Sequence, residues 1–362
     1  MEIIFAAIIC SLIALVSKKL SFPTIPLYIL AGLVLGEWSV LTQSEISEFL
    51  SKIGVILLLF YIGLHINPEE IRKKKGMIFS AGMFDLIVNF PLIFFVSLAL
   101  GFSYSQAFIL ASALYVSSSA IVLQSLIENR KLIYKEAETI VWIMVFEDIV
   151  IALLIVLNSL NFTSITVFFV KLSVFTLLAM YLSKRVKGIE GIFTRDDEVP
   201  ILFSFSIALL SIAFEELFDI PLAYASIMLG LIFSGIKRVR EIIVPFKEVF
   251  LAIFFFFFGL SAEITLKGLE SFLMILVTIV GKILSGILTG FKIHRSFNSG
   301  MEIGMSTIAR GEFSAFLVYA YGDPSVISIV MLVIIFTSIL GTILSKYSER
   351  IIQSFQYISR ML

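Results

Sequence analysis

Two adjacent carboxylates, Glu147 and Asp148, stand near the middle of an apolar stretch that runs from Thr139 to Leu157. The stretch is long enough to cross a bilayer as a helix, where an acid costs roughly 3 kcal/mol or more. Neighbouring helical side chains point about 100° apart, so one acid can line a cavity while the other meets another helix. Close carboxylates raise each other's proton affinity, which lets such a group hold either a proton or a cation. The pair predicts cation/proton exchange centred on Asp148; a structural ion pair is the alternative.

Further charged and polar residues lie in two other apolar stretches. A buried lysine such as Lys282 either pairs with a carboxylate or loses its charge, so we expect it to be a charge partner in the site. Gly286 and Gly290 follow it on one face and predict close approach of another helix. Asp85 and Asn89 lie one turn apart and share a face. They either support the polar core of the site or reach the interface and make structural hydrogen bonds.

Two more stretches carry polar residues that predict interrupted helices. Ser117, Ser118 and Ser119 lie mid-span in one, and Arg310 and Glu312 flank a glycine in the other. Broken helices expose backbone groups and dipole ends, which a membrane tolerates only around a cavity. We expect the Ser118 and Ser119 hydroxyls to bind the cation, with Ser117 in support. Arg310 and Glu312 are expected to compensate the exposed helix ends.

These stretches belong to a chain of 362 residues that is 59% hydrophobic, with a mean hydropathy of +1.06. Such a composition is typical of a polytopic membrane protein, and no polar stretch is long enough for a soluble domain. We therefore exclude nucleic-acid binding and soluble catalysis, and expect neither enzyme activity nor a cofactor. Cys10 is the single cysteine, which excludes an internal disulfide and a cysteine-based metal site. Glu2 and Lys18 flank the first apolar run in the wrong order for a cleaved signal peptide.

Thirteen apolar spans are predicted, of which the second and ninth are short. Links after odd-numbered spans, with the C-terminal tail, carry 22 of the 27 basic residues. This asymmetry predicts a plasma-membrane protein with its N-terminus outside and its C-terminus in the cytoplasm. The spans are 3–20, 25–41, 49–66, 77–100, 104–127, 134–157, 163–183, 199–218, 221–236, 241–262, 269–291, 298–321 and 325–347.

Spans one to six match spans eight to thirteen in the placing of prolines and glycines. Each span of the first copy is seven places before its equivalent in the second copy. Because seven is odd, the two copies have opposite topology in the membrane. Inverted repeats are typical of secondary transporters, which bind substrate near the bilayer midplane between the halves. The same offset places Asp85 and Lys282 at equivalent positions. The matched segments are Phe22–Gly36 with Ile220–Gly235 and Ile53–Leu64 with Val249–Leu260, at offsets of 198 and 196 residues.

A resemblance to a known family rests on Pro26–Gly36, Leu57–Leu64, Ser117–Val122, Phe146–Asp148, Lys282 and Arg310–Phe313. Through these motifs the chain resembles the monovalent cation:proton antiporter-2 family over nearly its whole length. The resemblance implies that Asp148 binds the ion and that Lys282 pairs with Glu147. Glu147 departs from the family pattern. Sodium-selective electrogenic relatives usually carry aspartate there, electroneutral ones asparagine, and the potassium-efflux branch glutamine.

The resemblance also implies a fold in which a six-helix core, with two discontinuous helices that cross, moves as an elevator beside a dimerisation domain. It assigns residues 1–76 and 199–268 to the dimerisation or scaffold helices and 77–160 and 269–347 to the core. Residues 161–198 become a linking helix and a cytoplasmic loop. We therefore expect an all-α polytopic membrane protein with thirteen transmembrane helices and two inverted six-helix repeats, which forms a homodimer.

The expected function is secondary active exchange of a monovalent cation for protons, electrogenic and serving pH homeostasis. Na⁺ is the favoured ion at Asp148, and Li⁺ or K⁺ are alternatives. A K⁺/H⁺ antiporter or a K⁺ efflux pathway is the second interpretation, and a cation channel would conduct without proton coupling. An intramembrane aspartyl protease is disfavoured because its two acids would face each other from different helices. The expected partners are these ions, protons and the lipid bilayer.

Overall fold

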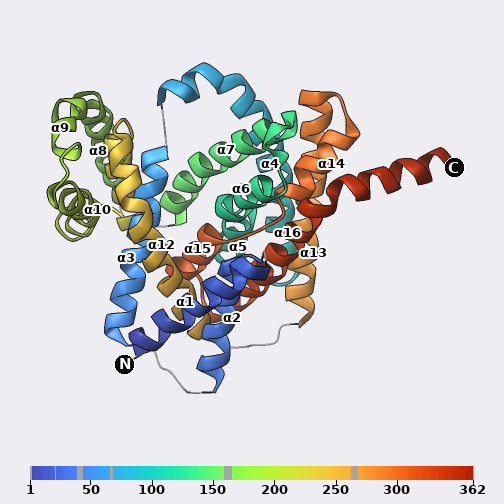
Figure 1. Ribbon diagram of the computed structural model, residues 1–362, viewed down its shortest axis with the longest axis horizontal. Coiled ribbons are helices and arrows are strands. Elements are labelled where there is room, and N and C mark those ends of the chain that lie inside the picture. The colour runs from blue at the N-terminus through green and yellow to red at the C-terminus, as the bar shows by residue number, and fades with distance from the viewer. Residues whose placement is uncertain are drawn as a thin grey trace. The chain divides into compact units, whose positions relative to one another are not determined.

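The computed structural model describes residues 2–20, 22–38, 44–65, 68–158, 165–261 and 268–361. All regular structure in these ranges is helical, which confirms the predicted all-α class (Figure 1). The helices are α1 (Glu2–Leu20), α2 (Thr24–Glu37), α3 (Glu45–His65), α4 (Pro68–Ala99), α5 (Tyr104–Tyr115), α6 (Ser119–Glu128), η1 (Lys131–Ile133), α7 (Lys135–Asn158), α8 (Ile165–Arg185), η3 (Val186–Ile189), α9 (Glu190–Phe193), α10 (Val199–Phe218), α11 (Leu222–Phe233), α12 (Lys237–Leu260), α13 (Gly268–His294), α14 (Phe297–Ser306), α15 (Glu312–Tyr321) and α16 (Pro324–Met361).

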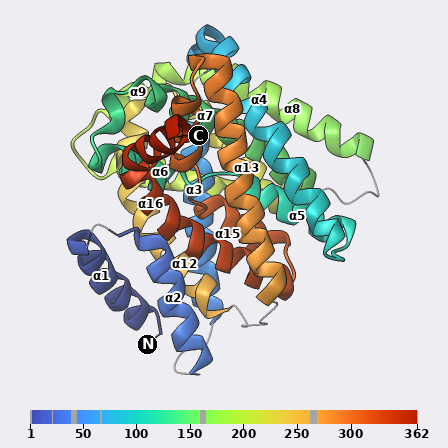
Figure 2. The same ribbon diagram turned by 90° about the vertical axis from the view of Figure 1, so that its right-hand side faces the viewer.

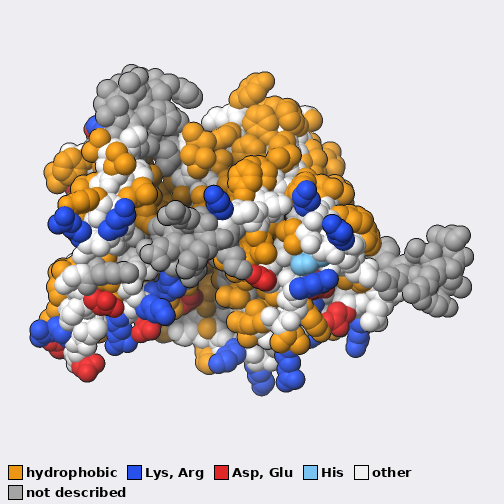
Figure 3. All heavy atoms as spheres, turned by 90° about the horizontal axis from the view of Figure 1, so that it is seen from above, with side chains coloured by type: hydrophobic (Ala, Val, Ile, Leu, Met, Phe, Trp, Pro, Cys, Tyr) orange, Lys and Arg blue, Asp and Glu red, His pale blue; other side chains and the backbone are white. Residues whose placement is uncertain are grey.

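Seven helical segments in the described ranges are long and apolar enough to cross a membrane. Large apolar side chains on them are exposed, such as Phe95 of α4 and Phe272 of α13, and hydrophobic side chains cover much of the face in Figure 3. Lipid tails are the surroundings in which such exposure is favourable. The predicted short spans two and nine correspond to α2 and α11, which are 14 and 12 residues long. The chain is therefore a multi-pass membrane protein.

Two helices extend beyond the predicted apolar spans. α4 begins at Pro68 instead of residue 77, and α16 continues to Met361 instead of ending at 347 (Figure 1). Both extensions are rich in residues that favour helices, such as lysine, arginine and glutamine. Hydropathy marks only the apolar part of a helix, so it misses a polar continuation of the same backbone.

One compact unit consists of Met1–Ala7, Gln43–Lys73 and Ala152–Phe257. In it α11 packs against α3, α8 and α10, and its residues from Ala223 to Phe233 are all buried. The contact with α3 is made by glycines, because a Cβ added at Gly63 would lie 2.0 Å from Ile227 O. Small residues allow two helix backbones to approach closely in a membrane, where packing supplies much of the association energy.

A second compact unit consists of Ile8–Thr42, Lys74–Ile151 and Phe258–Leu362. Within it α13 packs against α14 and α16, and α15 packs against α5 and α16 (Figure 2). The predicted glycine face of α13 is confirmed. A Cβ at Gly286 would lie 2.3 Å from Gly304 N, and a Cβ at Gly290 would lie 2.2 Å from Gly300 Cα. Close packing of α14 on α13 positions the chain that follows α14.

Replacing Gly63 with alanine should destabilise the protein, because the added methyl group meets backbone atoms of α11 that cannot rotate away. Overpacking of this kind costs about 1–3 kcal/mol. The matched control is Gly76→Ala in α4, where nothing lies within 4 Å of the added Cβ. We expect Gly63→Ala to lower the unfolding temperature of the detergent-purified protein and Gly76→Ala to leave it unchanged or slightly raised. Equal unfolding temperatures for the two variants would contradict the close α3–α11 contact.

Candidate functional site

Two helical segments of the second unit are interrupted, between α5 and α6 and between α14 and α15 (Figure 1). The two breaks are hydrogen-bonded to each other. The backbone N–H of Ser118 donates to Ala309 O at 2.7 Å. The Ser117 hydroxyl donates to Thr307 O at 2.9 Å. A Cβ at Gly311 would lie 2.5 Å from Ser118 Oγ, so only glycine fits at this point. The interruptions therefore form one structural element.

Arg310 lies in the second break and compensates carboxyl ends of helices. Its side chain is completely buried. Its Nε donates to Leu114 O at 2.7 Å, in the last turn of α5. Its Nη1 donates to Ile308 O at 2.8 Å and to Thr307 O at 3.1 Å, directly after α14. Carbonyls at a helix end carry partial negative charge and have no partner within the helix, so a guanidinium there is stabilising.

Glu312 occupies the corresponding amino ends. It is the first residue of α15 and is 3% exposed. Its Oε2 accepts a hydrogen bond from Ser118 Oγ at 2.7 Å, and its Oε1 accepts one from Ser119 Oγ at 3.3 Å. Ser118 is the N-cap of α6. The carboxylate therefore lies beside the positive ends of two short helices, where negative charge is favoured.

Lys282 of α13 is fully buried between two acids from different helices. Its Nζ lies 2.7 Å from Asp85 Oδ2 on α4 and also forms an ion pair with Glu147 Oε1 on α7. The same Nζ lies 5.4 Å from the ring centroid of Tyr115, at the end of α5. Two carboxylates and one ammonium leave this triad with a formal charge of −1. A lysine buried this deeply stays charged only with such partners.

Hydrogen bonds fix both acids of the triad. Glu147 accepts from Ser117 N at 3.0 Å, and the single hydroxyl hydrogen of Ser117 is shared between Glu147 Oε1 and Thr307 O, each at 2.9 Å. Asp85 Oδ1 accepts from Ser285 Oγ at 2.9 Å and from Asn89 Nδ2 at 2.9 Å. Because Ser117 also bonds Thr307 O, the triad is joined directly to the two helix breaks.

Asp148 differs from the other acids of this cluster. It is only half-buried, and its side chain makes no hydrogen bond or ion pair with any described residue. It follows Glu147 on α7, so its side chain points about 100° away from the one that binds Lys282. A carboxylate without a partner among the described residues is chemically able to bind either a proton or a small cation.

The structure gathers the predicted site residues other than Asp148 into one hydrogen-bonded cluster. It also adds residues that the sequence did not single out. Ser285 could have been found, because it lies one turn beyond Lys282 on the same helix face. Tyr115 lies two residues before the first serine of the run. The carbonyls of Leu114 and Thr307 carry no signal in the sequence, because any residue supplies them.

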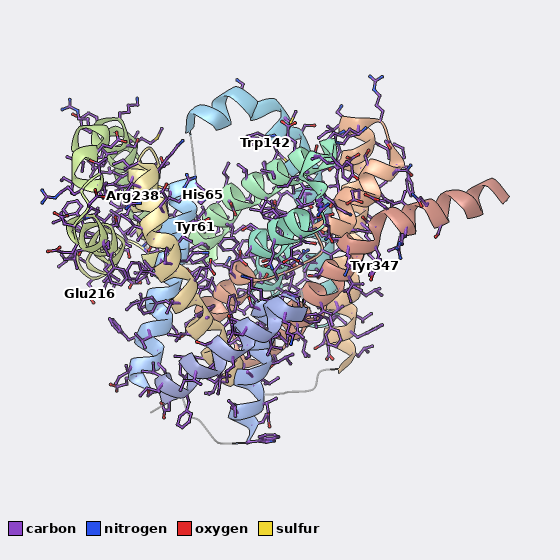
Figure 4. All side chains as sticks on the ribbon, in the orientation of Figure 1. Tyr61, His65, Trp142, Glu216, Arg238 and Tyr347 are labelled. Atoms are coloured by element: carbon purple, nitrogen blue, oxygen red, sulfur yellow. The ribbon has the colours of Figure 1, made fainter. Side chains whose placement is uncertain are left out.

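Other polar contacts lie outside this cluster. Lys131 of η1 is buried and binds Glu302 of α14 at 2.7 Å, which braces the start of α7 against α14. His65 bonds Tyr61 O at 2.9 Å within α3, and their rings lie 4.1 Å apart (Figure 4). Among the described residues no group of three or more His, Cys, Asp or Glu side chains is arranged to hold a metal ion.

Comparison with known proteins gives a consistent result. The family model described as sodium/hydrogen exchanger, transmembrane, matches residues 4–346. The chain is 29% identical to the K(+)/H(+) antiporter subunit KhtU of Bacillus subtilis (strain 168), over 97% of this chain and 93% of that protein. It is 22% identical to the ammonium/H(+) antiporter subunit AmhT of Alkalihalophilus pseudofirmus, over 94% and 90%. It is 26% identical to the probable Na(+)/H(+) antiporter GerT of Bacillus cereus, over 82% and 84%.

A solved structure shares the fold. The sodium proton antiporter MjNhaP1 from Methanocaldococcus jannaschii, at pH 8, superposes with a TM-score of 0.72. The match covers 98% of this chain and 99% of that one at 17% sequence identity.

Replacing Arg310 with methionine should destabilise the protein severely. The change keeps much of the side-chain volume but leaves the buried carbonyls of Leu114 and Ile308 without their side-chain donor, at about 1–3 kcal/mol for each unsatisfied group. Thr307 O keeps its bond from the Ser117 hydroxyl. Arg238→Met is the control, because Arg238 is half-exposed and, among the described residues, pairs only with Glu241, at 3.1 Å (Figure 4 labels Arg238). We expect a much lower unfolding temperature, or no monodisperse protein, for Arg310→Met and little change for Arg238→Met. A normal unfolding temperature for Arg310→Met would show that the helix ends do not depend on the guanidinium.

Proposed function

The chain belongs to the sodium/hydrogen exchanger family, and from this premise we propose that it exchanges a monovalent cation for protons at Asp148. Its relatives are cation/proton antiporters, so the family function is transport and not enzymatic catalysis. The observation that carries the proposal is the state of Asp148. Among the described residues it is a half-buried acid without a protein partner, next to a cluster whose other acids, Asp85, Glu147 and Glu312, all accept hydrogen bonds. We assign Ser118 and Ser119 as further ligands, because they begin α6 and follow the serine that binds Glu147, the neighbour of Asp148.

Sodium remains our first candidate for the cation, with lithium or potassium as alternatives. The family description and the name of the Bacillus cereus relative refer to sodium. A K⁺/H⁺ antiporter is the second candidate, because the Bacillus subtilis relative bears that name and aligns over 97% of this chain. Glu147 does not decide between them, since it is held by Lys282 and Ser117 in the described structure.

We further propose thirteen spans in two inverted repeats, with the N-terminus outside and the C-terminus cytoplasmic. A pair of glycine contacts supports the repeat. Gly63 of α3 packs on α11, and its proposed equivalent, Gly259 of α12, lies against Ile29 of α2, the proposed equivalent of α11. The proposed mechanism is an elevator in which residues 77–160 and 269–347 carry the ion past scaffold helices from 1–76 and 199–268. Residues 161–198 link the halves, and two copies form a dimer.

The direct test is exchange by wild-type protein and by Asp148→Asn in proteoliposomes. The substitution keeps the shape of the side chain but removes the group that titrates. Wild-type protein should give dequenching of an entrapped pH dye when sodium, lithium or potassium is added, and Asp148→Asn should give none. Asp196→Asn is the control, because Asp196 is exposed between α9 and α10. Retained cation-dependent proton flux in monodisperse Asp148→Asn protein would move the site elsewhere.

We propose that exchange is electrogenic. If cation binding separates Glu147 from Lys282 and the lysine releases its proton, two protons return for each cation. Each cycle then moves one net charge, worth about 2.3 kcal/mol per 100 mV. If the ion pair is only a brace, Asp148 alone exchanges one proton for one cation and voltage has no net effect. A fully buried lysine is a costly brace, which favours the first scheme.

Lys282→Gln should therefore retain some exchange but lose its response to a potential imposed with potassium and valinomycin. The test uses sodium or lithium as substrate, so that potassium is not itself transported. Asp85 keeps its Ser285 and Asn89 hydrogen bonds in this variant. If wild-type exchange at equilibrium is insensitive to the potential, the Glu147–Lys282 pair is structural.

A further inference from the structure

The charges of the polar cluster do not balance. The cluster and the neighbouring Asp148 contain four acids, and two bases oppose them. Lys282 binds Asp85 and Glu147, as described above. Arg310 donates to backbone carbonyls of Leu114, Thr307 and Ile308 and forms no ion pair with a described acid. Two carboxylates, Asp148 and Glu312, are thus left without a basic partner in the described part of the chain.

Glu312 is the more unusual of these two acids, because only 3% of it is exposed. A carboxylate removed from water needs a counter-charge or takes up a proton. The side-chain groups that donate hydrogen bonds to Glu312 are the neutral hydroxyls of Ser118 and Ser119. These are the hydroxyls that the proposed function gives to the cation. Asp148 directly follows Glu147, which binds the first serine of the same run.

The hydroxyls of Ser118 and Ser119 can bind Glu312 and a cation at the same time. Each serine donates its single hydroxyl hydrogen to Glu312, which leaves its oxygen lone pairs for a cation. Ser118 also accepts from Ile121 N at 3.4 Å as the cap of α6, whereas Ser119 is half-buried. A cation placed among Ser119, Asp148 and Glu312 would meet two carboxylates and a hydroxyl oxygen.

We propose that Glu312 is a second acidic ligand of the transported cation, and that Asp148 and Glu312 hold one dehydrated monovalent cation between them with the help of Ser118 and Ser119. This inference rests on the proposed function. The cation neutralises one of the two unpaired charges, and a proton can neutralise the other. Glu312 is therefore a binding group of the exchange site, in addition to its place at the amino ends of α6 and α15.

A structural role alone makes a different prediction from a binding role. Glutamine at position 312 can still hydrogen-bond both hydroxyls, accepting through Oε1 and donating through Nε2, but it has no charge. If Glu312 is a ligand, its removal weakens cation binding and also makes Asp148 easier to deprotonate. The other charged or titratable groups around Asp148 stay unchanged: Glu147, Lys282, Asp85, Arg310 and Tyr115.

The experiment compares wild type, Glu312→Gln, Glu312→Asp and Glu302→Gln in proteoliposomes, with exchange measured against cation concentration and pH. We expect Glu312→Gln to raise the KM for the cation at least tenfold and to shift the pH midpoint of exchange to lower pH. Glu312→Asp keeps the charge but is shorter, so the KM should rise while the pH midpoint stays in place. Glu302 is a buried acid of the same unit that binds Lys131, and Glu302→Gln should change neither value.

An unchanged KM and pH midpoint in folded Glu312→Gln protein would overturn the inference, as would an equal shift in Glu302→Gln. If Glu312→Gln does not fold, Glu312→Asp decides: a wild-type KM in this variant would reduce Glu312 to a structural brace. Lack of cation/proton exchange by the wild-type protein is a separate outcome, because it would refute the proposed function itself.

Discussion

The ion pairs of Lys282 with Asp85 and Glu147 are the interactions on which the polar centre depends. None of the three side chains is stable alone in an apolar interior, because an isolated buried charge loses several kcal/mol of hydration. Together they join α13, α4 and α7 at one point, with Nζ 2.7 Å from Asp85 Oδ2. This arrangement fixes the side of α7 that faces α13. It thereby directs the next residue, Asp148, away from the triad and leaves its carboxylate available.

The interrupted helices complete the same arrangement. Ser117 bonds both Glu147 and Thr307 O, so a displacement of the triad would also displace the backbone at both helix breaks. The Arg310 guanidinium binds carbonyls at the carboxyl ends of α5 and α14, where the helix dipole is negative. The Glu312 carboxylate lies at the amino ends of α6 and α15, where the dipole is positive. Exposed backbone groups at membrane depth require such compensation or a cavity. Hydrogen bonds and ion pairs therefore hold most side chains of the centre, whereas Asp148 makes none with the described residues.

Much of this could be predicted from the sequence, because a polar residue is conspicuous in an apolar span. The pair at 147 and 148, the serine run, Lys282 and the Arg310–Glu312 motif were all visible for that reason. Partner choice was harder to predict. Asp85 lies 197 residues from Lys282, and hydropathy contains no information about which spans face each other. Only the offset between the repeats hinted at this contact. The carbonyl partners of Arg310 and the polar extensions of α4 and α16 could not be found, because backbone acceptors and soluble helical turns leave no apolar pattern.

The central claim is that one carboxylate without a protein partner exchanges a proton for a cation. The most direct measurement is proton release from the purified protein in weakly buffered detergent solution when sodium, lithium or potassium chloride is added. Choline chloride at equal ionic strength serves as the reference. We expect saturable release of at least one proton per protein with a transported cation, and none with choline. If none of the three cations releases protons beyond the choline reference, cation and proton do not compete for one site, which would contradict this account.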